Sequence, residues 1–178
     1  LATLLVFGEV RRILIVAPKR VAQFTWPEAV DSFNLSFGHL TINVAIGTPE
    51  QRHAAVRSPS HIVTINFENL TWLVEHYGET WPFDMVVIDE LSSFKSYQAK
   101  RFRSLLKVRP TVTRIVGLTG TPSGNGLMDL WAEFRLLDMG ARLGRFISHY
   151  RLDYFQPDKR NGQVIFNYKP LPGAEQRI

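Results

Sequence analysis

The sequence predicts a doubly wound α/β fold, in which a parallel sheet carries helices on both faces. Short apolar stretches rich in β-branched residues alternate with helical stretches along most of the 178 residues. Strands buried on both faces read as continuous apolar runs, as in Met85-Val86-Val87-Ile88, because helices cover both sides of a parallel sheet. Strands that alternate with helices at this rhythm are typical of doubly wound sheets.

The expected strands are short and spread along the chain. They cover residues 12–17, 42–46, 61–65, 84–89 and 114–118. Pro18 ends the first of them, because proline has no N–H to give to a sheet ladder. Before the first strand, residues 1–8 predict the last turns of a helix that ends at Gly8.

Two similar motifs predict where the early helices begin. Thr25-Trp26-Pro27-Glu28 fits a capping box with proline in the first turn, which predicts a helix to about Phe33. Thr48-Pro49-Glu50-Gln51 opens a second helix by the same device, and this helix should end near Ser58.

The later helices follow from glycine stops and apolar periodicity. We expect one helix from Asn66 through Tyr77, closed at Gly78, and a basic helix over residues 97–107. A further amphipathic helix is predicted by apolar residues on one face, namely Leu127, Met128, Leu130, Trp131, Phe134 and Leu137.

The pattern changes after Gly140, which divides the expected fold into a main part, residues 1–140, and an extension, residues 141–178. Residues 142–155 predict one more helix, and residues 163–168 a short strand or hairpin arm. Between them, residues 156–162 read as an exposed loop, because proline, asparagine and glycine gather there.

Composition excludes several classes of protein. The absence of cysteine excludes disulfides and thiolate metal sites, and the histidines show no paired ligand spacing. The chain has no apolar run long enough to cross a bilayer, so we expect a cytoplasmic protein. The formal charge is +5, and residues 91–114 carry seven Lys or Arg and no acid. That run is either a solvated helix face or a phosphate-binding surface.

Two turns are expected to meet at one edge of the sheet. Asp89 and Glu90 follow one buried strand, and the turn that begins at Thr119 follows another. Ligands of doubly wound sheets bind at the carboxyl ends of the strands, so these turns mark a candidate site. An acidic pair alone is more often a solvated loop or a helix cap than a catalytic site.

Four ordered motifs carry a resemblance to a known family. They are Val16 to Val21, Met85 to Ser92, Arg114 to Asn125, and Leu127 to Trp131. Together they resemble the Swi/Snf-type ATPases of the DEAD/DEAH helicase superfamily, and residues 83–138 are especially similar to phage-encoded members. The resemblance implies the first RecA-like lobe of a P-loop NTPase that hydrolyses ATP with magnesium and moves on DNA, usually duplex DNA.

The resemblance also assigns roles at the sheet edge. Asp89 would hold the magnesium ion and Glu90 would polarise the attacking water. Thr119, Gly120 and Thr121 would couple the nucleotide to movement of the DNA-binding surface. Ser92 stands where the superfamily often has histidine, and it could hydrogen-bond across to the same turn.

DNA-backbone contacts are implied at separate turns, and each has a plainer alternative. The implied residues are Lys19, Arg20, Thr64, Asn66 and Asn125. Lys19 and Arg20 could instead be ordinary surface charges, while Thr64 and Asn66 could form a strand-end turn and a helix cap. The tryptophans are expected in the core.

The resemblance predicts that parts of the family's machinery lie outside this chain. The sequence has no Gly-Lys dipeptide, so the phosphate loop and its strand are expected to precede Leu1. A second RecA-like lobe with its arginine finger is also expected elsewhere. The chain alone should then not turn over ATP, and its sheet should have an exposed apolar edge that makes it unstable.

Two other functions remain open. A degenerate lobe could bind DNA or a protein without hydrolysing ATP, through the basic stretch from Lys95 to Arg114. An unrelated α/β hydrolase could use Asp89 and Glu90, but no nucleophile elbow or metal-ligand set supports it.

Overall fold

The doubly wound α/β prediction is confirmed by a five-stranded sheet in which all the neighbouring strands pair in parallel. A computed structural model of the chain describes residues 1–120, 126–161 and 164–178. The strand order is β2-β3-β1-β4-β5. The strands are β1 (Ile13–Ala17), β2 (Ile42–Val44), β3 (Ile62–Asn66), β4 (Met85–Asp89) and β5 (Arg114–Leu118).

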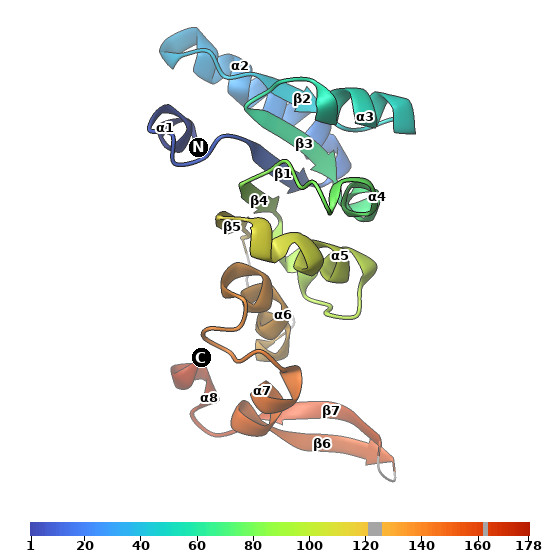
Figure 1. Ribbon diagram of the computed structural model, residues 1–178. Helices are drawn as coiled ribbons and strands as arrows, with labels where there is room; N and C mark the ends of the chain where they lie inside the picture. Colours follow the sequence, from blue (N-terminus) through green and yellow to red (C-terminus); the bar gives the residue numbers. More distant parts are fainter. Residues whose placement is uncertain (121–125, 162–163) are drawn as a thin grey trace.

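Helices cover both faces of the sheet, because successive side chains of a strand point to opposite sides (Figure 1). Ile13, Ile15 and Ala17 of β1 pack toward α1 (Ala2–Val6) and α2 (Trp26–Phe37). The alternate residues, Leu14 and Val16, join the core beneath the helices on the other face. Those helices are α3 (Pro49–Arg57), α4 (Phe67–Tyr77) and α5 (Lys100–Val108).

One of the two predicted capping boxes is present. Thr48 caps α3: its hydroxyl accepts from the backbone N–H of Gln51, whose side chain accepts from the N–H of Thr48 at 2.8 Å. The prediction of a capping box at Thr25 is wrong, because Thr25 already has helical dihedrals and its side chain makes no capping hydrogen bond. The chain turns helical at Lys19, passes through the π-helix η1 (Val21–Thr25) and continues as α2 to Phe37.

The basic helix is shorter than predicted. Two 3₁₀ turns flank it, η2 (Leu91–Phe94) before α5 and η3 (Arg109–Thr111) after it. Tyr97 therefore lies before α5 rather than inside it. Strand β2 also ends earlier than expected, at Val44.

The extension folds differently from the prediction. After α6 (Leu127–Asp138) the chain turns at Met139 and Gly140, both with positive φ, and α7 covers only Ile147–Tyr154. The prediction of an exposed loop at residues 156–162 is wrong, because β6 (Phe155–Asn161) pairs antiparallel with β7 (Val164–Pro170). Strand β7 confirms the short strand or hairpin arm predicted at residues 163–168, over its described part. Its partner β6 was missed because Pro157 and Asn161 are residues typical of loops. The chain ends in α8 (Ala174–Arg177).

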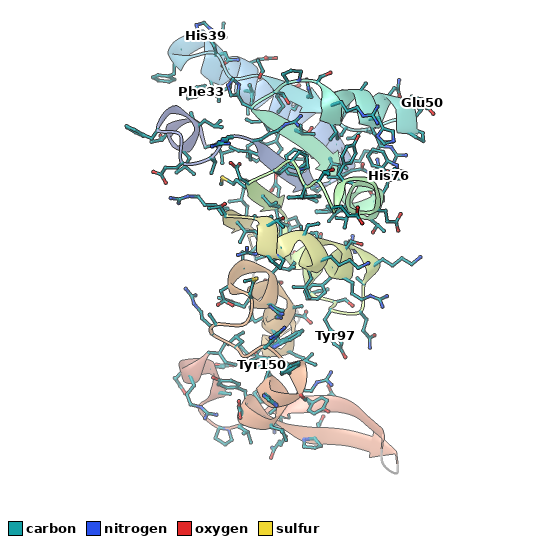
Figure 2. All side chains as sticks on the ribbon, in the orientation of Figure 1. Phe33, His39, Glu50, His76, Tyr97 and Tyr150 are labelled. Atoms are coloured by element: carbon teal, nitrogen blue, oxygen red, sulfur yellow. The ribbon has the colours of Figure 1, made fainter. Side chains whose placement is uncertain are left out.

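A buried tyrosine fastens the extension to the rest of the core. Tyr150 of α7 is fully buried, and its hydroxyl donates to the carbonyl of Leu127, in the first turn of α6, at 2.6 Å. Figure 2 labels Tyr150 where α7 approaches α6. Leu143 and Phe155 belong to the same buried cluster, so the extension shares the main core.

Strand β5 lies at the end of the described sheet and exposes apolar side chains. Val116 is 38% exposed and Leu118 41% exposed, whereas β1, β3 and β4 are almost entirely buried. Among the described residues, none of the helices is long and apolar enough to cross a membrane.

Candidate active site at the carboxyl edge of the sheet

The two predicted turns meet at the carboxyl edge of the sheet, as expected. Asp89, the last residue of β4, lies beside Leu118, the last residue of β5. These strand ends line an open cleft of about 460 Å³, together with Glu90, Gly117, Thr119 and Gly120. Thr121 and Asn125, which complete the predicted motif, lie outside the described residues.

Glu90 is held in an unusual backbone conformation. Its φ of 72° and ψ of 67° are left-handed, a region that side chains with a Cβ rarely adopt. Its N–H donates to the carbonyl of Leu118 at 2.9 Å, which fixes the residue against the end of β5. Strain of this kind gathers at functional sites, where the surrounding structure enforces it.

Two hydroxyls converge on one oxygen of the Glu90 carboxylate. Thr119 donates its hydroxyl to Oε1 at 3.1 Å, and Ser92 donates to the same atom. Ser92 was expected to bond to the Thr119 turn itself; instead the serine and the threonine meet through the Glu90 carboxylate, which lies between them. A carboxylate held by two donors has a fixed orientation, which a group that positions a water molecule requires.

The Asp89 carboxylate has a partner that the sequence did not reveal. The indole N–H of Trp26 donates to Oδ2 of Asp89 at 2.9 Å. We expected Trp26 in the core, and this first residue of α2 is half-buried and packs against the buried cluster on that face of the sheet. A buried indole usually finds an acceptor, but no sequence pattern indicates which acceptor that is across 63 residues.

The predicted DNA-contact residues occupy two different environments. Lys19 and Arg20 are exposed at the start of the helical segment that follows β1. Thr64 is fully buried, and its hydroxyl donates to the carbonyl of Ala22 at 2.7 Å. In this arrangement the hydroxyl of Thr64 ties β3 to η1 and presents no surface to a ligand.

Asn66 takes part in a local side-chain network. It occupies the N-cap position of α4, but its side chain makes no capping bond to the backbone. Its amide instead donates to Glu68 at 2.5 Å and accepts from Asn69 at 2.7 Å. Asn66 is 5% exposed, so in this arrangement it presents little surface to a ligand.

The basic run separates into buried and exposed members. Arg109 is buried, and its guanidinium donates to the carbonyls of Leu136 at 2.5 Å and Leu137 at 2.8 Å. Burial lowers the pKa of Arg109, and the carbonyls that end α6 satisfy its donors. Arg114 pairs with Glu9. Arg109 is therefore used inside the fold and Arg114, although exposed, is engaged by an acid, whereas four other exposed members remain available: Lys95, Lys100, Arg103 and Lys107.

A buried carboxyl lies close to this site. Glu133 of α6 is 1% exposed, and its Oε1 has no hydrogen-bond partner among the described residues. Burial, with help from Asp129 and Glu90, raises the pKa of Glu133 to about 7, and Lys95 opposes this shift. The sequence did not predict a buried acid here, because Glu133 lies among the apolar residues of α6 and follows no recognisable motif.

The residues at the edge fit a hydrated magnesium ion. The described residues contain no cluster of three or more His, Asp or Glu that could enclose a metal. Magnesium usually keeps several waters and binds one or two carboxylates together with substrate phosphates, so a dedicated cage is not needed. Asp89, with one oxygen engaged by Trp26, fits that role.

Comparisons with known proteins agree with this architecture. A model of the SNF2-related domain matches residues 6–146. Putative protein p41 of Acyrthosiphon pisum secondary endosymbiont phage 1 is 38% identical over 180 residues, which is 96% of this chain and 38% of that protein. The DNA excision repair protein ERCC-6-like of Bos taurus is 29% identical over 111 residues, which is 62% of this chain and 8% of that protein.

A solved structure gives the same fold. The Sulfolobus solfataricus SWI2/SNF2 ATPase core in complex with dsDNA superposes with a TM-score of 0.69 at 21% identity. The match covers 86% of this chain and 30% of that one. The chain thus spans about a third of the phage relative and of the archaeal core.

Proposed function

The chain belongs to the SNF2-related domain family, and from this premise we propose that it is the first RecA-like lobe of a DNA-dependent ATPase that moves along duplex DNA. The observation that carries the proposal is the strained Glu90, whose carboxylate is held by Ser92 and Thr119 beside Asp89. Strain and convergent donors at a strand end indicate a carboxylate kept in place for chemistry rather than a solvated loop.

Each acid has a separate role in the proposed reaction. Asp89 would hold a hydrated magnesium ion, whose charge would offset the negative charge that develops on the phosphates of ATP. Asp89 would orient the waters around that ion, while its Oδ2 stays fixed by Trp26. Glu90 would hold the attacking water in line with the terminal phosphate and accept its proton.

The turn after β5 would change its position with the state of the bound nucleotide. Thr119 contacts the Glu90 carboxylate directly, so a change at the phosphates can reach the chain that leads to α6. We extend this coupling role to Gly120 and Thr121, which come next in the sequence. Asn125 remains a proposed DNA contact.

DNA would lie along the carboxyl edge near the exposed Lys19 and Arg20. Contacts of this kind neutralise phosphates and position the duplex without reading its sequence. We place Thr64 and Asn66 behind this surface as supports. A second lobe and a phosphate loop, both expected outside these residues, would complete the nucleotide site, and residues 141–178 would lead toward that lobe.

A binding module without hydrolysis is the second candidate. The exposed side chains of Lys95, Lys100, Arg103 and Lys107 favour it, because their charge could bind phosphates in the absence of nucleotide. This reading predicts salt-sensitive DNA binding that does not respond to ATP or magnesium.

Phosphate release by the full-length protein distinguishes the two candidates. We expect ATP hydrolysis that needs magnesium and rises at least about tenfold when duplex DNA is added, because DNA would align the two lobes. DNA binding without any stimulated hydrolysis would contradict the ATPase proposal and favour the binding module.

A further inference from the structure

The helical segment that follows β1 contains a π-helix, Val21–Thr25. Such turns are rare, and they often mark functional sites. Here the backbone N–H of Trp26 donates to the carbonyl of Val21, five residues earlier, whereas that of Ala22 donates to Pro18, four residues earlier. The widened turn comes just before Pro27, which has no N–H to continue a regular α-helix.

This segment is anchored to the sheet at two points. The first anchor is the buried hydroxyl of Thr64 in β3, which donates to the carbonyl of Ala22 at 2.7 Å. The second is the indole N–H of Trp26, which donates to Oδ2 of Asp89 at 2.9 Å. The exposed Lys19 and Arg20 lie at the start of the same segment.

The π-helix sets the direction in which Trp26 points. One extra residue in a turn rotates every later side chain by about 100° around the helix axis, because an α-helix has about 3.6 residues per turn. With that rotation the indole reaches the end of β4, two strand positions from β3 in the sheet order. A regular helix through Val21–Thr25 would direct Trp26 elsewhere.

We propose that Trp26 is a positioning residue that links the DNA-facing turn at Lys19 and Arg20 to the magnesium carboxylate of Asp89. The inference rests on the proposed function and adds to it a second path between DNA and nucleotide, separate from the Thr119 turn. An indole is a donor only, so it holds Oδ2 of Asp89, and Oδ1 would be left for the waters of the ion. A shift of the DNA-facing turn then changes how well Asp89 holds magnesium.

Trp26→Phe tests this link, because it removes the N–H and keeps an aromatic ring. The probe is magnesium titrated by calorimetry into the full-length protein with saturating ADP, which requires no turnover. We expect half-saturation at about tenfold higher magnesium, the lower end of the effect of losing an outer-shell partner. Trp81→Phe is the matched control, because the indole nitrogen of Trp81 has no hydrogen-bond partner among the described residues.

A second variant keeps the test valid if Trp26→Phe does not fold. Thr64→Val removes the other anchor with little change of shape, and we expect DNA to stimulate its ATP hydrolysis at least about threefold less than that of the wild type. Unchanged DNA stimulation in Thr64→Val, or unchanged magnesium half-saturation in a folded Trp26→Phe, would overturn the link while the wild type still hydrolyses ATP. A wild type without DNA-stimulated hydrolysis would overturn the proposed function itself, and the link with it.

Discussion

Thr119 and Glu90 are 29 residues apart in sequence, yet the threonine hydroxyl donates to Oε1 of the glutamate at 3.1 Å. The bond joins the turns that follow β4 and β5, neighbouring strands of the sheet. It makes the orientation of the Glu90 carboxylate depend on a second segment of chain.

Thr119→Val should lower the turnover rate for ATP by about tenfold, because the Glu90 carboxylate loses one of its two hydroxyl donors. Thr119→Ser keeps the hydroxyl and is the matched control. Steady-state phosphate release by the full-length protein, with duplex DNA present, measures the difference. Equal turnover in the valine and serine variants would show that the hydroxyl does not position Glu90.

Glu90→Gly should stabilise the fold while it abolishes hydrolysis. Glycine adopts the left-handed conformation of residue 90 without a Cβ clash, so relief of strain should add about 1 kcal/mol to the free energy of unfolding. Urea unfolding of the wild type, Glu90→Gly and Glu90→Ala measures it, since alanine keeps the clash. A glycine variant no more stable than the alanine variant would argue against strain at this position.

Glu133 should make stability fall as the pH rises. Its pKa is raised to about 7 in the folded protein, from an ordinary value of 4.5, so the folded state holds a proton that the unfolded state releases. The stabilising contribution is complete below about pH 4.5 and is lost as the pH rises through about 7. Glu133→Gln cannot titrate and should not show this loss.

Thermal melting at several pH values measures the effect of Glu133. The melting temperatures of wild type and Glu133→Gln should agree near pH 4.5 and differ by about 3 °C or more at pH 8, with the variant higher. Glu75→Gln, at an exposed position of α4, controls for the loss of one charge. A constant difference across this range would place the titration of Glu133 near its ordinary pKa.

Arg109 should contribute to the free energy of unfolding, whereas the exposed basic residues should contribute to the affinity for DNA. Arg109→Met leaves the carbonyls of Leu136 and Leu137 without donors and should cost about 2–4 kcal/mol of unfolding free energy. Arg103→Met, at an exposed position of α5, should change stability by less than about 0.5 kcal/mol. If DNA binds this helix, its affinity should fall for Arg103→Met, and urea unfolding with DNA titration separates the two effects.

The sequence predicted those parts of the fold that depend on local pattern. Apolar runs such as Met85 to Ile88 indicate buried parallel strands, because both of their faces must lie in a core. Thr48 and Gln51 predict the start of α3, because their capping bonds are made within four residues. The meeting of the turns at Asp89 and Thr119 followed from the parallel topology alone.

The misses depend on contacts between distant segments or on unusual backbone. The motif at Thr25 has the residues of a capping box, but the π-helix before it keeps that position helical. Charge alone did not separate the buried Arg109 from the exposed Arg103, since tertiary packing decides which one meets the end of α6. The partner of Trp26 likewise depends on where β4 lies relative to α2.

The most direct test of the account is the effect of Glu90→Gln on DNA-stimulated ATP hydrolysis. Glutamine keeps the size of the side chain but cannot accept a proton from the attacking water. In the full-length protein we expect turnover to fall at least about a hundredfold while ATP still binds, in line with the loss of a general base. Turnover within about twofold of the wild type would contradict the assignment of Glu90 and, with it, the proposed active site.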